Sequence, residues 1–205
     1  MPRARECLEI AVEMFRREEK KDPMGYLSAQ LSLAYVSLEY RDFKKALYLS
    51  KSIIETGFDQ ESLDSISKNV VQRQLATARL YASEASCALG DAMGSMKFLV
   101  AGGKEDAFDK LASELGGVTL EAAASNAKGK SRLARAQAMV RCSASAASAS
   151  LGNVAAAKQL AMSAQAMEDT YSASRERSLA RRALVFCMLR EGNNGSALNL
   201  LRPVR

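Results

Sequence analysis

The sequence predicts an all-α protein, built as an irregular array of helical hairpins with a short insertion, and three observations support this. No proline lies between Pro23 and Pro203, so no long helix in that stretch must be broken. Apolar residues recur at helical spacing, whereas strand-forming residues never alternate over five or more positions. A turn signature also recurs, in which a glycine is followed by Asp or Asn and, five residues after the glycine, by a small residue. Such a repeated turn between helical stretches is typical of arrays of helical hairpins.

The turn signature occurs at Gly90, Gly152 and Gly192. Glycine adopts the left-handed conformation that ends a helix without strain, and the Asp or Asn that follows can cap the next helix. The small residue comes one turn into that next helix, as Ala157 after Gly152 and Ala197 after Gly192. A small side chain there lets the two helices of a hairpin approach closely.

The first part of the chain is expected to hold a leading helix and one hairpin. Residues 3–21 place apolar side chains on one side, and Pro23 ends this helix because the residue before a proline avoids the helical region. A hairpin follows over about residues 24–56. Its first helix contains Tyr35, and its second contains Ala46 behind a looser copy of the turn signature that lacks the glycine.

Three further hairpins complete the array. They are expected over about residues 74–100, 131–168 and 174–202. The polar residues 59–73 predict a lead-in turn before the second hairpin. Residues 101–130 interrupt the pattern with glycine pairs and short helical fragments, which predicts an insertion folded back on the array. We expect one domain over residues 1–205, and the abrupt end of the chain indicates a fragment of a longer subunit.

The composition argues against catalysis and cofactors. The chain has no histidine, which removes the commonest general base near neutral pH and the commonest metal ligand. The cysteines are scattered without a CxxC pair, so a structural zinc site is not expected; they are Cys7, Cys87, Cys142 and Cys187. We therefore expect no enzyme, no metal and no other cofactor. Free thiols and the lack of a signal peptide favour the cytosol or the nucleus, and no apolar run is long enough to span a membrane.

Positive charge is concentrated in the C-terminal part. Residues 128–205 carry 13 Lys or Arg against 4 Asp or Glu, whereas residues 1–127 carry 16 against 19. Arg181 and Arg182 belong to the densest basic cluster. A solvated helix face is the simplest interpretation, an acidic protein partner comes next, and RNA comes third because no aromatic residues are interleaved for base stacking.

A stretch of alanine and serine predicts either tight packing or a binding groove. Residues 143–150 contain only Ser and Ala, and they lie between apolar residues at helical spacing. Small side chains allow a neighbouring helix to come very close, so packing within the array is the first interpretation. The second is a groove open to a partner helix. The residues expected to face such a groove are Met139, Cys142, Ala146 and Ala149 in the third hairpin. Equivalent positions are Leu33 and Val36 in the first hairpin, Leu80, Glu84 and Cys87 in the second, and Arg182, Phe186, Leu189 and Arg190 in the fourth.

These features resemble a known repeat family. Gly152 with Ala157, and Gly192 with Ala197, fall at the turn-glycine and second-helix-alanine positions of the tetratricopeptide pattern. A more particular resemblance rests on four ordered segments: Ser32–Leu38 with Ala46, Leu80–Ala85, Ala136–Met139 with Ala157, and Glu191–Asn193 with Ala197–Leu201. In this order they resemble the C-terminal, tetratricopeptide-like region of subunit ten of the CCR-NOT mRNA deadenylase complex.

The resemblance implies a scaffold without enzymatic activity that joins subunit eleven and the N-terminal region of the large NOT scaffold subunit. Its role would lie in poly(A) shortening, mRNA turnover and translational repression. The alternative hypothesis is a basic RNA-binding helical module. The two differ in the salt dependence of binding, because phosphate contacts weaken steeply with salt and apolar docking does not.

Overall fold

The computed structural model describes residues 2–17, 22–56, 64–100, 107–118, 123, 125–167 and 174–201. In these ranges the chain forms ten α-helices and no strand, which confirms the all-α prediction. The helices are α1 (Pro2–Arg17), α2 (Pro23–Glu39), α3 (Phe43–Glu55), α4 (Ser65–Ala88), α5 (Ala92–Leu99), α6 (Ala107–Gly116), α8 (Ala127–Ser150), α9 (Val154–Gln165), α10 (Ser174–Arg190) and α11 (Asn194–Leu201).

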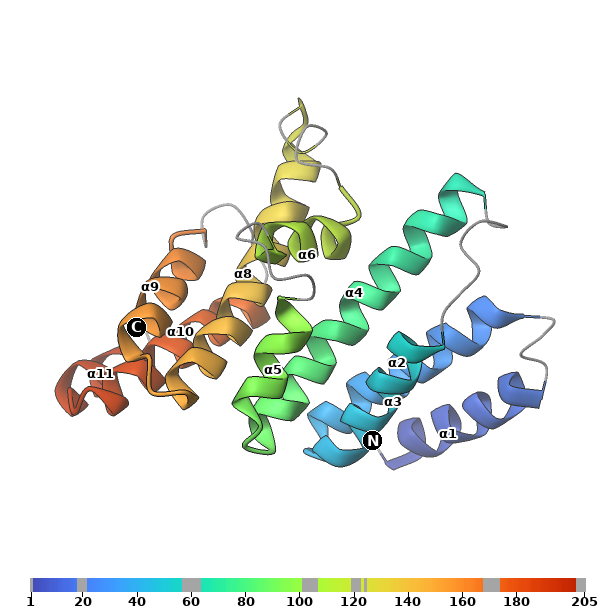
Figure 1. Cartoon of the computed structure of the whole chain (residues 1–205), viewed down its shortest axis with the longest axis horizontal. Coiled ribbons are helices and arrows are strands. Elements are labelled where there is room, and N and C mark those ends of the chain that lie inside the picture. The colour runs from blue at the N-terminus through green and yellow to red at the C-terminus, as the bar shows by residue number, and fades with distance from the viewer. Residues whose placement is uncertain are drawn as a thin grey trace.

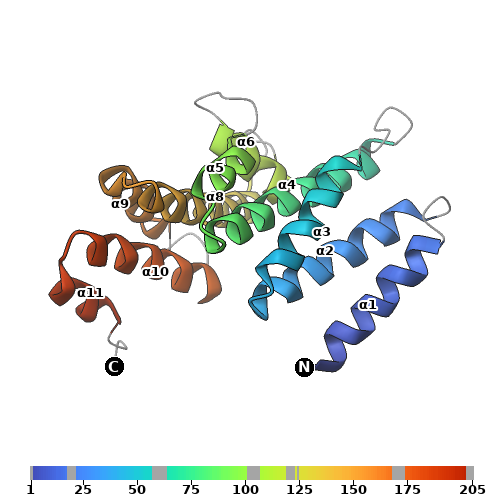
Figure 2. The ribbon, with the colours of Figure 1, turned by 60° about the horizontal axis from the view of Figure 1, so that its bottom comes forward.

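The helices form a row of hairpins that follows the order of the chain. The hairpins are the pairs α2–α3, α4–α5, α8–α9 and α10–α11, and each packs on its neighbour. In Figure 1 the row runs from α1 at one end to α11 at the other. Figure 2 shows that the row is bent, so that α1 and α10 lie on the same side of it.

The glycine turns between the hairpin helices have the conformation that the sequence predicts. Gly90, Gly152 and Gly192 have φ angles of 87°, 85° and 76°, in the left-handed region. The residue after each glycine caps the next helix: the side chain of Asp91 accepts a hydrogen bond from the backbone N–H of Gly94 at 2.8 Å. In the looser first copy, Arg41 takes the left-handed position with φ 59°.

The small residues behind the turns are buried at helix contacts. Ala46 and Ala157 are fully buried, and Ala197 is 1% exposed. Ala46 packs with Leu38 and Ala85, and therefore joins the first hairpin to α4. These contacts agree with the close helix approach expected from the sequence.

Tyr35 also joins neighbouring hairpins. Its ring centroid lies 5.9 Å from that of Tyr81 on α4, in a tilted arrangement. Such aromatic pairs add about 0.5–1.5 kcal/mol beyond the area that they bury.

The helix α4 begins earlier than predicted. Residues 59–73 were expected to form a lead-in turn, but the helix begins at Ser65. The carboxylate of Asp64 caps it, accepting a hydrogen bond from the backbone N–H of Ser67 at 2.6 Å. Polar residues on the exposed side of these first turns hide the periodicity, although Val71 is fully buried.

The helix α8 also begins earlier than predicted, within residues 101–130 that were expected to form the insertion. The side chain of Asn126 caps it, accepting a hydrogen bond from the backbone N–H of Gly129 at 2.6 Å. Gly129 is buried inside the first turn, so this glycine lies within a helix instead of breaking one.

The helix α6 bridges the second and third hairpins. It packs on α4 and α8, and Leu111 is fully buried in the largest core cluster between them. Arg79 of α4 pairs with Glu114 of α6 at 3.5 Å. Asp109 of α6 lies 3.6 Å from a guanidinium nitrogen of Arg141 on α8. These contacts join α6 to α4 and α8, two helices that also line the groove described below.

Candidate protein-binding groove

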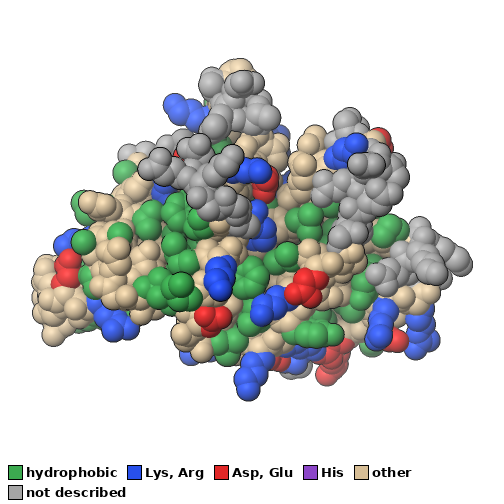
Figure 3. Space-filling view, viewed as in Figure 1, with side chains coloured by type: hydrophobic (Ala, Val, Ile, Leu, Met, Phe, Trp, Pro, Cys, Tyr) green, Lys and Arg blue, Asp and Glu red, His purple; other side chains and the backbone are tan. Residues whose placement is uncertain are grey.

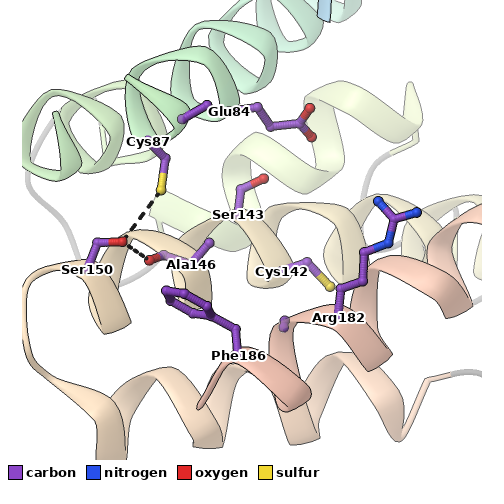
Figure 4. A pocket seen from close by; sticks show the side chains of 10 residues that line it. Glu84, Cys87, Cys142, Ser143, Ala146, Ser150, Arg182 and Phe186 are labelled. Carbon is purple, nitrogen blue, oxygen red and sulfur yellow. Dashed lines mark hydrogen bonds between the residues drawn. The ribbon is translucent and has the colours of Figure 1, made fainter. Parts of the chain in front are cut away.

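The first helices of three successive hairpins, α4, α8 and α10, enclose a groove of about 440 Å³ (Figure 4). Its lining residues are Glu84, Cys87 and Ala88 from α4, Cys142, Ser143, Ala146 and Ser150 from α8, and Arg182, Ala183 and Phe186 from α10. Because these helices belong to different hairpins, the groove exists only when the array is assembled.

The floor of the groove is made by the alanine and serine stretch of α8. This helix contacts both α4 and α10, and its other sides are buried against the core, where Ala144 and Ala147 are fully buried. The side chains of Ala146 and Ser143, which face the groove, have only one and two heavy atoms. The small side chains thus leave an open channel between the larger residues of α4 and α10.

One end of the groove is apolar and uncharged. Figure 4 shows Cys87, Ser150, Ala146 and Phe186 together at this end. The hydroxyl of Ser150 donates to the carbonyl oxygen of Ala146 at 2.9 Å, and the Cys87 sulfur lies 3.9 Å from the same hydroxyl. Burial raises the pKa of the Cys87 thiol above its ordinary value, so the thiol stays neutral at physiological pH. This end therefore presents a surface suited to apolar side chains.

The other end of the groove is charged. Glu84 on α4 and Arg182 on α10 lie at this end, on opposite walls (Figure 4). The groove as a whole thus combines an apolar half with one acidic and one basic side chain.

Four residues proposed from the sequence line the groove, together with Glu84 and Cys87 of the second hairpin. They are Cys142, Ala146, Arg182 and Phe186. The exposed ring of Phe186 has the Arg190 guanidinium 5.3 Å from its centroid, which is a cation–π contact.

Eight other proposed residues lie outside the groove. Leu33 and Leu80 are buried in the core, and Val36 and Arg190 do not line the groove. Met139 packs against the core cluster shared by α4, α6 and α8, and Ala149 is 1% exposed beside Ala157. Leu189 is 51% exposed on α10, and Arg181 is half-buried, but neither lines the groove.

Four further residues line the groove although the sequence did not indicate them: Ala88, Ser143, Ser150 and Ala183. Ser150 follows Ala149, which was proposed but is buried. Successive residues of a helix point about 100° apart, so an error of one position in the rotation of α8 exchanges these two. The alternation of Ala and Ser gives no polarity difference from which the correct face could be read.

A second hollow of about 430 Å³ lies along α3, where Tyr48, Lys51, Ser52, Glu55 and Thr56 line it. Unlike the groove, it is lined by one helix and its end, and not by several hairpins. On the face seen in Figure 3, hydrophobic side chains form small groups separated by charged and polar residues. Within the described ranges, no three Cys, Asp or Glu side chains come together as metal ligands. A search of the same residues finds no helix long and apolar enough to cross a membrane.

No protein family, curated protein or solved structure matches this chain. The resemblance to subunit ten of the CCR-NOT complex therefore rests on the sequence segments alone.

Proposed function

We propose that this protein is a non-enzymatic scaffold that binds a segment of a partner protein in the groove between α4, α8 and α10. The observation that carries the proposal is the open channel over Ala146, with Cys87 and Phe186 on either side. Burying apolar side chains of a partner there removes apolar surface from water on both molecules. Grooves of this kind commonly accept an amphipathic helix or an extended segment.

The size of the groove sets the expected affinity. A volume of about 440 Å³ accommodates only a few side chains. Two or three apolar anchors would contribute about 1.5–3 kcal/mol each, from which the cost of association and ordering must be subtracted. The gain is at most about 9 kcal/mol before a cost of at least about 4 kcal/mol is subtracted, so a short segment alone is expected to bind weakly, with a Kd of roughly 0.1–1 mM or above.

The assembly that we propose is the CCR-NOT deadenylase complex. The ordered segments that resemble its subunit ten support this, and by that resemblance the partners are subunit eleven and the N-terminal region of the large NOT scaffold subunit. The protein would then act in poly(A) shortening, mRNA turnover and translational repression, in the cytoplasm and the nucleus.

RNA binding is the second candidate, and the excess of Lys and Arg over residues 128–205 favours it. The groove does not share this excess, since its lining contains one Arg, one Glu and mostly small or apolar side chains. An RNA backbone would therefore be attracted only weakly to this surface, because its phosphates bind to clustered Lys and Arg side chains.

The test is a blocking substitution with a matched control. Ala146→Trp should fill the channel and abolish binding of the co-purified partner in isothermal titration calorimetry, with the melting temperature near that of the wild type. Ala155→Trp places the same ring on an exposed alanine of α9 and should bind normally. Normal binding by the Ala146→Trp variant would show that the groove is not the docking site. A substitution at the neighbouring Ala149, such as Ala149→Arg, would not test the groove, because Ala149 is 1% exposed and the new side chain would be forced into the core.

A second test addresses the lack of enzymatic activity. The purified chain, incubated with polyadenylated RNA, should leave the tail intact. Tail shortening that survives repeated purification would contradict the proposal.

A further inference from the structure

The charged end of the groove contains a basic group that the described part of the chain does not neutralise. Arg182 is exposed on α10, and no described residue forms an ion pair with it. Two basic residues of the neighbouring third hairpin, by contrast, have acidic partners: Lys158 pairs with Glu191 at 2.8 Å, and Arg141 lies 3.6 Å from Asp109.

The position of Arg182 relates it to the apolar end of the groove. Arg182 and Phe186 are four residues apart on α10, so they lie on the same side of the helix, about 5–6 Å apart at their Cβ atoms. Both line the groove. A segment that places an apolar side chain against Phe186 must therefore present another side chain to Arg182 one helical turn away.

We infer that the segment binds in the groove as a helix, that it carries an acidic residue three or four positions from its apolar anchor, and that Arg182 pairs with this residue. Arg182 thus places the acid on the α10 side of the groove, one helical turn from the anchor against Phe186. This inference rests on the proposed function and specifies the chemistry of the partner.

The first experiment selects ligands without assuming the partner. A phage-displayed library of random peptides of ~14 residues, about four helical turns, is selected on the wild-type chain. Peptides that bind wild type but not the Ala146→Trp variant occupy the groove. We expect these peptides to be enriched in Asp or Glu three or four positions from a Leu, Ile, Met or Phe, with no such enrichment when selection is repeated on Arg182→Glu.

The second experiment measures one selected peptide by isothermal titration calorimetry. Arg182→Glu should weaken binding roughly tenfold, because an attraction becomes a repulsion at a partly exposed site. Arg181→Glu carries the same change of charge one residue away, outside the groove, and should alter affinity less than about twofold, given the weak coupling of exposed charges. Replacing the acid of the peptide by Lys should restore binding to the Arg182→Glu variant.

Distinct outcomes would overturn the inference and the proposed function. Groove-bound peptides without an enriched acid, or an Arg182→Glu variant with unchanged affinity, would refute the role of Arg182 while leaving the scaffold intact. If no selected peptide is blocked by Ala146→Trp, the proposed function fails and the inference with it. The wild-type chain could instead bind random single-stranded RNA tightly, with an affinity that falls steeply with salt. If the Arg181→Glu and Arg182→Glu variants both lost this binding, the two arginines would be RNA phosphate contacts and not part of a peptide site.

Discussion

Replacing Ala157 by Leu should destabilise the protein, because Ala157 lies where α9 comes closest to α8. The residue is fully buried and packs with Ala149 and Cys187. Its carbonyl oxygen accepts a hydrogen bond from the hydroxyl of Ser145 on α8 at 2.7 Å, inside the core. A larger side chain at position 157 would push α9 away from α8 and lengthen this hydrogen bond.

The structure gives the expected magnitude. Leu adds three carbon atoms to a site without space, and such overpacking typically costs about 1–3 kcal/mol. Moving α9 outward would also lengthen the hydrogen bond from Ser145 to Ala157, a loss of about 0.5–1.5 kcal/mol. The free energy of unfolding should therefore fall by roughly 2–4 kcal/mol.

Urea denaturation followed by circular dichroism measures this change. With an m-value of about 2–3 kcal/mol/M, the midpoint of Ala157→Leu should lie about 1 M below that of the wild type. The control is Ala155→Leu, which makes the same substitution on an exposed position of α9 and should leave the midpoint nearly unchanged. Equal midpoints for the two variants would show that Ala157 is not a close contact between the helices.

Three further predictions concern a turn, the groove and the first helix. Gly152→Ala should lower the free energy of unfolding by about 1 kcal/mol in the same urea assay, because φ is 85° although no atom lies within 4 Å of an added Cβ. Cys87 should react with iodoacetamide at neutral pH more slowly than a cysteine in an unfolded peptide, because burial raises the pKa of the Cys87 thiol. A peptide bound in the groove should slow this reaction further. Mass spectrometry measures the rate of modification. The Glu9 carboxyl should titrate by NMR below its ordinary pKa of 4.5, because it accepts hydrogen bonds from Lys45 and Arg5. The contact of α1 with α3 should therefore weaken only as the pH falls through that lowered pKa. A pKa at or above 4.5 would contradict these contacts.

Features that depend on neighbours in the sequence could be predicted well. A glycine that must adopt a positive φ, such as Gly152, and the Asn153 side chain that caps the next helix at 3.2 Å, act within a few residues of each other. The turn therefore follows from local backbone sterics and hydrogen bonding. The same holds for the burial of Ala157 one turn later, since close packing of a hairpin requires a small residue there.

The starts of two helices, which depend on both local sequence and tertiary packing, could be predicted less well. The start of α4 at Ser65 and of α8 at Ala127 lay in polar or glycine-containing stretches. Helix propensity is weak in such stretches, and packing decides. Val71 is fully buried against the array, and Gly129 is buried within α8, so tertiary contacts extend both helices beyond the periodic segments.

The sequence by itself determined the fold class, the hairpin turns and the candidate stretch of small residues, because these depend on period, capping and side-chain size. Only the tertiary structure decided which of those small residues face open space. Ala146 and Ala149 are chemically identical and three positions apart, yet one lines the groove and the other is buried beside Ala157. The reason is physical: the rotation of α8 about its axis is set by simultaneous packing against its hairpin partner α9 and against α4 and α10, which belong to other hairpins.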